Sequence, residues 1–219
     1  MTDYLAWYIM SRMIETLLKR YPLISSQVDK AELRVILREL ESVLENAIDG
    51  DVAELGCYKG TTSLFLARIL ETRNESRKLY LYDSFAGLPL KSAKDNSTVG
   101  DQFVAGELYT TKADLVRTFT KNHLPQPTIK KAWFSDLDKT DMPERICFAF
   151  FDGDFYESIR DSFRVCQNVF SPGATIVIDD YDSEALPGAA RATDEWIKQH
   201  QTMVKSFRTE QSLGIIKLV

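Results

Sequence analysis

The stretch ICFAFFDGDFYES, residues 146–158, combines a buried strand with acidic residues at its end. Residues 146–151 form a continuous apolar and aromatic run, typical of a strand that helices cover on both faces of a parallel sheet. Asp152 and Asp154 follow at the carboxyl end of this strand, where open α/β sheets bind their ligands. The stretch therefore predicts a central strand with a functional site at its end.

A second strand of the same kind, residues 174–178, also ends in two acids, Asp179 and Asp180. No Lys or Arg lies between residues 146 and 159 or between residues 165 and 190, so no cation that is near in sequence neutralises these carboxylates. Such a cluster is costly unless a metal ion or a proton compensates its charge. The pattern indicates that chemistry takes place at these strand ends.

Length and composition are those of one globular α/β domain. The chain has 219 residues, of which 44% are hydrophobic and 27% charged, and this is enough to bury a full core without disulfides. Its formal charge of -5 argues against sequence-independent binding to nucleic acid. Cys57, Cys147 and Cys166 lie in mostly apolar contexts without CxxC spacing, which favours buried thiols. No apolar run approaches 18 residues, so we expect a soluble, cytoplasmic protein that does not enter a membrane.

The first 49 residues show two helical patterns. Apolar residues recur at helical spacing from Leu5 to Leu18, Ile9 among them, and again over residues 33–48. We expect an N-terminal helical cap over residues 1–49 and a single α/β unit over residues 50–219. The helices are expected to pack against the sheet edge; the alternatives are a cap over the active site or a contact between copies in a homo-oligomer.

A strand, a glycine turn and a helix follow. Residues 52–55 are predicted as a strand and residues 56–60 as a loop bounded by Gly56 and Gly60, with Thr61 or Thr62 capping the next helix. The spacing is GxxxG rather than GxGxxG, so the standard cradle for the pyrophosphate of a dinucleotide is absent. A cofactor without a bridging pyrophosphate fits this loop better.

The next two strands, residues 78–82 and 128–131, also end in polar or aromatic residues. Asp83 is expected to accept hydrogen bonds from ribose hydroxyls, as acids in this place of nucleotide-binding α/β units do; the alternative is that it only begins a turn. Residues 132–136 are expected beside an adenine, although Trp133 and Phe134 could equally belong to the core.

The remaining segments complete a doubly wound α/β pattern. Residues 87–111 form a long polar connection, predicted as a substrate lid or as a disordered insertion. Helices are predicted over residues 111–122, 156–170 and 188–200, and the last two strands, 203–208 and 214–219, are close enough to pair as a hairpin. The predicted fold is a mostly parallel seven-stranded sheet with an antiparallel strand at its C-terminal end.

Five motifs together resemble the macrocin-type O-methyltransferases. In chain order they are ELGCYKG (54–60), YDSFAGLP (82–89), WFSD (133–136), DGDFYES (152–158) and IDDY (178–181). The similarity covers about residues 49–196, and the combination is far more specific than any one motif. It implies a Rossmann-like class I methyltransferase that uses S-adenosylmethionine and Mg²⁺ to methylate sugar hydroxyls of natural products.

The resemblance also implies roles for particular residues. The implied cofactor-binding residues are Glu54, Gly56, Tyr58, Gly60, Asp83, Ser84 and Ser135; the implied metal ligands are Asp152, Asp179 and Asp180; and the implied base is Asp154. Two segments depart from the family pattern. Residues 136–139, DLDK, put contacts near Asp136 in doubt, and residues 89–111 match no macrolide pocket.

A carboxylate site for Mg²⁺ suits methyl transfer to an alcohol, because the cation lowers the pKa of the hydroxyl and orients it. The expected acceptor is a small molecule with a hydroxyl or a vicinal diol, and Asp154 would take its proton. The alternative for Asp154 is a helix cap, in a capping box with Glu157. Other functions remain open: methylation of a catechol or other phenol, an oxidoreductase or epimerase on the same fold, or a non-catalytic cofactor-binding module.

Overall fold

The computed structural model describes residues 2–100 and 102–219, with side chains from residue 11 onward. The strands of its sheet are β1 (Asp51–Leu55), β2 (Leu79–Asp83), β3 (Thr128–Lys131), β4 (Ile146–Phe151), β5 (Phe170–Ile178), β6 (Val204–Glu210) and β7 (Leu213–Leu218). The helices are α1 (Thr2–Arg20), α2 (Lys30–Glu45), α3 (Thr61–Thr72), α4 (Lys112–Lys121), α5 (Tyr156–Cys166) and α6 (Pro187–Gln199), with short 3₁₀ helices η1 (Ala93–Asp95) and η2 (Phe134–Asp136).

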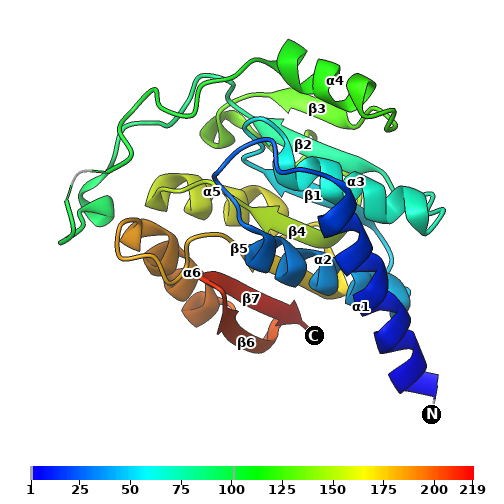
Figure 1. Cartoon of the computed structure of the whole chain (residues 1–219). Coiled ribbons are helices and arrows are strands. Elements are labelled where there is room, and N and C mark those ends of the chain that lie inside the picture. The colour runs from blue at the N-terminus through cyan, green and yellow to red at the C-terminus, as the bar shows by residue number, and fades with distance from the viewer. Residues whose placement is uncertain (1, 101) are drawn as a thin grey trace.

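The seven strands form one sheet in the order β3-β2-β1-β4-β5-β7-β6 (Figure 1). Strands β1 to β5 run parallel, and β7 lies antiparallel to both β5 and β6. This confirms the predicted doubly wound sheet. Because β1 pairs with both β2 and β4, the strand order reverses between β1 and β4, the place where such sheets bind ligands.

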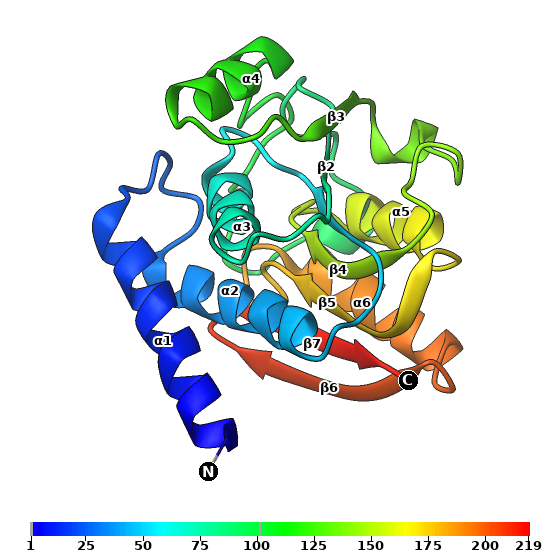
Figure 2. The ribbon, with the colours of Figure 1, turned by 90° about the vertical axis from the view of Figure 1, so that its right-hand side faces the viewer.

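Helices cover both faces of the sheet. Figure 2 shows α2 and α3 on one side and α5 and α6 on the other, with α1 packed outside α2. The side chains of β4 pack on both faces of the sheet. Phe148 and Phe150 belong to the core on the α2 and α3 side, and Ala149 and Phe151 belong to the core under α5 and α6. Burial on both faces is the physical reason for the unbroken apolar run.

The N-terminal segment shares its core with the sheet. Asp29 caps α2 in a reciprocal capping box with Glu32, and the apolar face of α2 lies in the same cluster as α3 and β4. Leu5 and Ile9, on which the prediction of the first helix partly rested, lie outside the residues whose side chains are described. Assembly of copies through these helices stays a prediction. None of the described helices has the length and apolar character needed to cross a membrane.

Three predicted helix boundaries are wrong. The second helix ends at Glu45, before the turn that contains Ile48, and α5 ends at Cys166 because Phe170 already pairs with Ile146 as the first residue of β5. Pro172, which has no N–H to donate, lies where the pairing of β5 with β4 is irregular. No threonine caps α3: its N-cap is Gly60, in a left-handed conformation, and Thr61 begins the helix.

Candidate active site

The sheet register aligns the ends of four parallel strands. Leu55 is paired with Tyr82 and with Phe151, and Phe151 is paired with Ile178. The residues that follow, Asp83, Gly56, Asp152 and Asp179, therefore lie side by side along one edge of the sheet. Residues that are far apart in the sequence meet there because parallel strands end at the same edge.

Gly56 is required by the close approach of two strands. Its φ is +92°, and a Cβ built on it would lie 1.7 Å from the backbone oxygen of Asp152. Only a residue without a side chain fits between β1 and β4 at this point. Gly56 thus allows the loop over residues 56–60 to lie directly against the backbone of Asp152.

Asp83 organises the loop after β1. Its Oδ2 accepts hydrogen bonds from the backbone N–H groups of Cys57 and Tyr58, at 3.0 and 2.9 Å, and its Oδ1 accepts one from Phe85 N–H at 2.7 Å. Asp83 therefore does begin a turn, which was the alternative prediction for this residue. Because a carboxylate has about four acceptor positions, the turn does not exclude a bond from a ribose hydroxyl.

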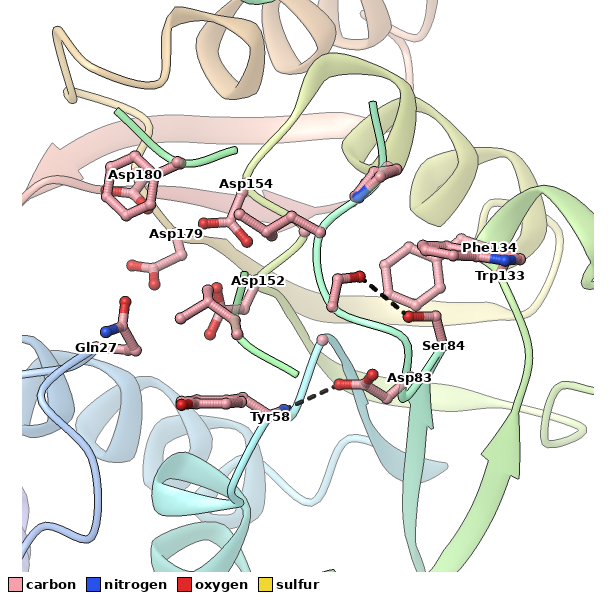
Figure 3. Close-up of a pocket in the computed structure, with 18 of the residues that line it drawn as sticks. Gln27, Tyr58, Asp83, Ser84, Trp133, Phe134, Asp152, Asp154, Asp179 and Asp180 are labelled. Carbon is pink, nitrogen blue, oxygen red and sulfur yellow. Dashed lines mark hydrogen bonds between the residues drawn. The ribbon is translucent and has the colours of Figure 1, made fainter. Parts of the chain in front are cut away.

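A cavity of about 260 Å³ opens above these strand ends. Figure 3 shows its two ends: Asp152, Asp154, Asp179 and Asp180 gather at one with Gln27 facing them, and Asp83 and Ser84 lie toward Trp133 and Phe134 at the other. The predicted site residues that line it are Gly56, Tyr58, Asp83, Ser84, Asp152, Asp154, Asp179 and Asp180.

Three predicted cofactor-binding residues do not line the cavity. Glu54 is buried at 1% exposure behind the loop; burial, with Asp83 nearby, raises its pKa to about 8, and its Oε2 has no hydrogen-bond partner. Gly60 is the N-cap that precedes α3, and a Cβ there would overlap Leu115. Ser135 is exposed, and its hydroxyl donates to Asp136. Their roles toward the cofactor stay predictions.

The acidic end carries strong mutual repulsion. Burial, followed by the neighbouring carboxylates, raises the pKa of Asp152 and of Asp179 well above the usual range, and burial with Asp180 raises that of Asp154 to about 8. Burial and Glu32 raise the pKa of Asp180 to about 6. Within the described residues, none of the four forms an ion pair with Lys or Arg. Such a cluster is stabilised by any positive charge that enters it.

Asp154 is not the cap of α5. The N-cap is Phe155, which makes no side-chain capping bond, and Glu157 pairs with Arg160 instead of closing a capping box. Asp154 itself has a left-handed backbone, with φ +59°, as does Asp180, with φ +53°. Non-glycine residues in this conformation are costly and cluster at functional sites. The capping alternative is therefore wrong.

The cavity also contains residues that the sequence patterns did not single out. Ser26 and Gln27 reach it from the connection between α1 and α2, and Leu88, Phe103 and Leu108 come from the connection between β2 and α4. No local signal marks Ser26 or Gln27, since their place depends on how α2 packs. Trp133, which could equally have been core, is 39% exposed at the cavity wall.

The residues present fit the nucleoside part of the implied methyl donor, and their donor chemistry suits the implied metal. Gly56 leaves room beside Asp83, and the aromatic rings of Trp133 and Phe134 offer a surface for a base, as a nucleoside-containing methyl donor requires. Carboxylate oxygens without a protein cation are the donors that Mg²⁺ prefers. Among the side chains that the structure describes, no three of Asp, Glu, His or Cys are arranged as a ready-made metal site, so the case for a metal rests on donor chemistry and charge.

The chain is similar to several known proteins. The family model Macrocin-O-methyltransferase (TylF) matches residues 20–210. Mycinamicin III 3''-O-methyltransferase of Micromonospora griseorubida is 27% identical over 189 residues, which cover 82% of this chain and 73% of that protein. The 8-demethyl-8-(2,3-dimethoxy-alpha-L-rhamnosyl)-tetracenomycin-C 4'-O-methyltransferase of Streptomyces olivaceus is 27% identical over 156 residues, which cover 68% of this chain and 60% of that protein.

Among solved structures, the O-methyltransferase NovP superposes with a TM-score of 0.79 at 20% identity, covering 98% of this chain and 99% of that one. This likeness supports the fold, while the match over residues 20–210 establishes the family. The chain therefore belongs to the macrocin O-methyltransferase family and is an S-adenosylmethionine-dependent O-methyltransferase.

Proposed function

We propose that this enzyme methylates a sugar hydroxyl of a glycosylated natural product, with a divalent cation at its acidic end. The observation that carries the proposal is the two-ended cavity: Asp83 and the aromatic pair lie at one end, and at the other lie four aspartates, with no Lys, Arg or His among the described residues that line the cavity. The first end suits the nucleoside of the methyl donor. The second suits a cation together with a hydroxyl that must lose its proton.

Each end has a distinct part in the reaction. When bound, S-adenosylmethionine supplies a methyl group on a positively charged sulfur, and a divalent cation supplies a Lewis acid that lowers the pKa of the acceptor hydroxyl. Asp152, Asp179 and Asp180 would hold the cation through carboxylate oxygens. Asp154 accepts the hydroxyl proton at its carboxylate while the acceptor oxygen forms its bond to the methyl carbon and the carbon–sulfur bond breaks.

The cavity wall favours a neutral acceptor with an apolar part. No Lys, Arg or His is among the described residues that line it, so a phosphate group would find no cation there except a bound metal. Leu88, Phe103 and Leu108 supply an apolar part of the same cavity lining. The name of the Streptomyces olivaceus relative contains a rhamnosyl group attached to tetracenomycin C, that is, a sugar on a larger natural product.

An acceptor comparison tests the proposal. With S-adenosylmethionine and MgCl₂, we expect an aryl rhamnoside with free vicinal hydroxyls to be methylated faster than methyl rhamnoside, a nucleoside-diphosphate rhamnose or catechol. Transfer of label to product, followed by mass spectrometry, measures each rate. Preferred turnover of the nucleotide sugar would contradict the neutral acceptor, and turnover of catechol alone would replace the sugar by a phenol.

We further predict that Asp83→Ala weakens binding of S-adenosylhomocysteine by about 10- to 150-fold, corresponding to the roughly 1.5 to 3 kcal/mol of a hydrogen bond to a charged group. Isothermal titration calorimetry without metal measures the affinity. Asp49→Ala is the matched control, because Asp49 is an exposed acid that pairs with Arg145 and lies outside the cavity. An analogue without ribose hydroxyls should lose much less affinity in the variant; an equal loss would mean that Asp83 acts only by ordering the loop.

A further inference from the structure

The connection over residues 87–100 and 102–111, called the lid from here on, contains a buried carboxylate that has no part in the mechanism above. Asp95 is 1% exposed, at the end of η1. Its Oδ2 accepts hydrogen bonds from the N–H and the hydroxyl of Ser92, at 2.8 and 2.7 Å. Its Oδ1 accepts one from the backbone N–H of Tyr156, at 2.6 Å, on α5. A buried acid of the lid is thus bonded to the first residue of the helix that follows Asp154.

This bond replaces a cap that α5 lacks locally. Its N-cap, Phe155, makes no side-chain capping bond, although a helix start leaves free N–H groups that need acceptors. The positive end of the helix also favours a carboxylate. Asp95 therefore satisfies the first turn of α5 from outside the helix.

The start of α6 is shaped to admit the same carboxylate. Gly188 lies in the first turn of α6, and a Cβ built on it would lie 1.9 Å from Asp95 Oδ1. Any larger residue there would collide with the acid. Two helix starts and the lid consequently meet at one carboxylate.

The helix that Asp95 caps begins two residues after Asp154. The intervening residue, Phe155, packs with Leu88 of the lid and with Leu186, and Phe103 and Leu108 of the lid pack against the same cluster. The turn that carries Asp154 is therefore held by the lid twice, through the Tyr156 N–H and through the Phe155 ring. Its left-handed backbone at Asp154 needs such support, because that conformation is costly by itself.

We propose that Asp95 is a positioning residue, which holds the lid and the Asp154 turn in a single arrangement. The role rests on the proposed function of Asp154 as base. Leu88 and Leu108 of the lid line the part of the cavity where the acceptor would bind. The bond from Tyr156 N–H to Asp95 therefore fixes the position of these acceptor-binding residues relative to Asp154. Displacement of the lid leaves Tyr156 N–H without its acceptor and frees the turn.

Asp95→Ala is expected to lower kcat at saturating acceptor by about 10- to 100-fold, because small misplacements of a catalytic group have effects of this size. Asp95→Asn should restore much of the rate, since its amide oxygen can still accept the Tyr156 N–H. Binding of S-adenosylhomocysteine should stay within about twofold, because neither Asp95 nor Tyr156 lines the cavity. In an Asp154→Asn background, Asp95→Ala should lower kcat no further.

Ser97→Ala is the matched control. It removes a hydrogen bond from the same part of the lid, to the backbone oxygen of Glu184, without touching α5. We expect unchanged kcat. A kcat for Asp95→Ala within twofold of the parent enzyme, with only the melting temperature lowered, would overturn the proposal and make Asp95 a structural residue.

Hydrogen exchange separates this proposal from the identity of the acceptor. Asp95→Ala should speed amide exchange in residues 153–158 as well as in the lid, whether or not any tested acceptor is methylated. Faster exchange in the lid alone would overturn the coupling even if turnover were lost. Should Asp95→Ala not fold, Ser92→Ala, which removes the hydroxyl bond to Asp95 Oδ2, gives the same comparison in a milder form.

Discussion

Asp154→Asn is expected to lower kcat by about 100-fold or more, the usual scale for the loss of a positioned base, while the melting temperature and the affinity for S-adenosylhomocysteine stay nearly unchanged. Asparagine keeps the shape of the side chain but cannot accept a proton at neutral pH. It also tolerates the left-handed backbone at this position better than most residues do. The substitution therefore removes the proton acceptor and preserves the backbone conformation at residue 154.

Single-turnover kinetics and thermal unfolding measure the two sides of this prediction. Glu157→Gln is the control, because Glu157 belongs to the same helix start but only pairs with exposed Arg160. It should leave kcat unchanged. If Asp154→Asn melted early and turned over normally, the proton would have to leave to another group, and Asp154 would support the turn only.

Removal of divalent cations with EDTA is expected to abolish turnover, and Asp179→Asn to lower it by at least about 100-fold. The second figure is the upper end of the cost of removing an outer-shell partner of a metal ligand, and a direct ligand should exceed it. Asp179 is 6% exposed and repelled by Asp180 and other acids, so the cation stabilises a site that is unfavourable without it.

Two further measurements distinguish the loss of a metal ligand from a simple loss of folding. Calorimetry should show weaker Mg²⁺ binding to Asp179→Asn, and in EDTA the variant should melt at the same or a higher temperature than the parent, because one repelling charge is gone. Asp49→Asn, an exposed acid that pairs with Arg145 at the opposite edge of the sheet, should change neither quantity. Full turnover in EDTA would reject the role of the metal and leave the family assignment intact.

Local patterns were sufficient for most of the elements and for the acids of the site. The run before Asp152 is apolar at every position, so its burial on two faces can be read without knowing its neighbours. An acid directly after such a strand must lie at the sheet edge where parallel strands end, which is why Asp83, Asp152 and Asp179 could be named together. The end of α5 was misplaced because the apolar residues up to Phe170 fit a helix face and a strand equally well.

The sequence by itself thus determined the strands, the glycine loop and the acids at the strand ends, because each depends on residues next to one another in the chain. Only the tertiary structure decided that Gln27 faces the aspartates, that Glu54 and Ser135 lie outside the cavity, and that Asp95 caps α5. These contacts join segments far apart in sequence, and no periodicity or spacing encodes such a pairing. They arise from how α2, the lid and α5 pack around one sheet edge.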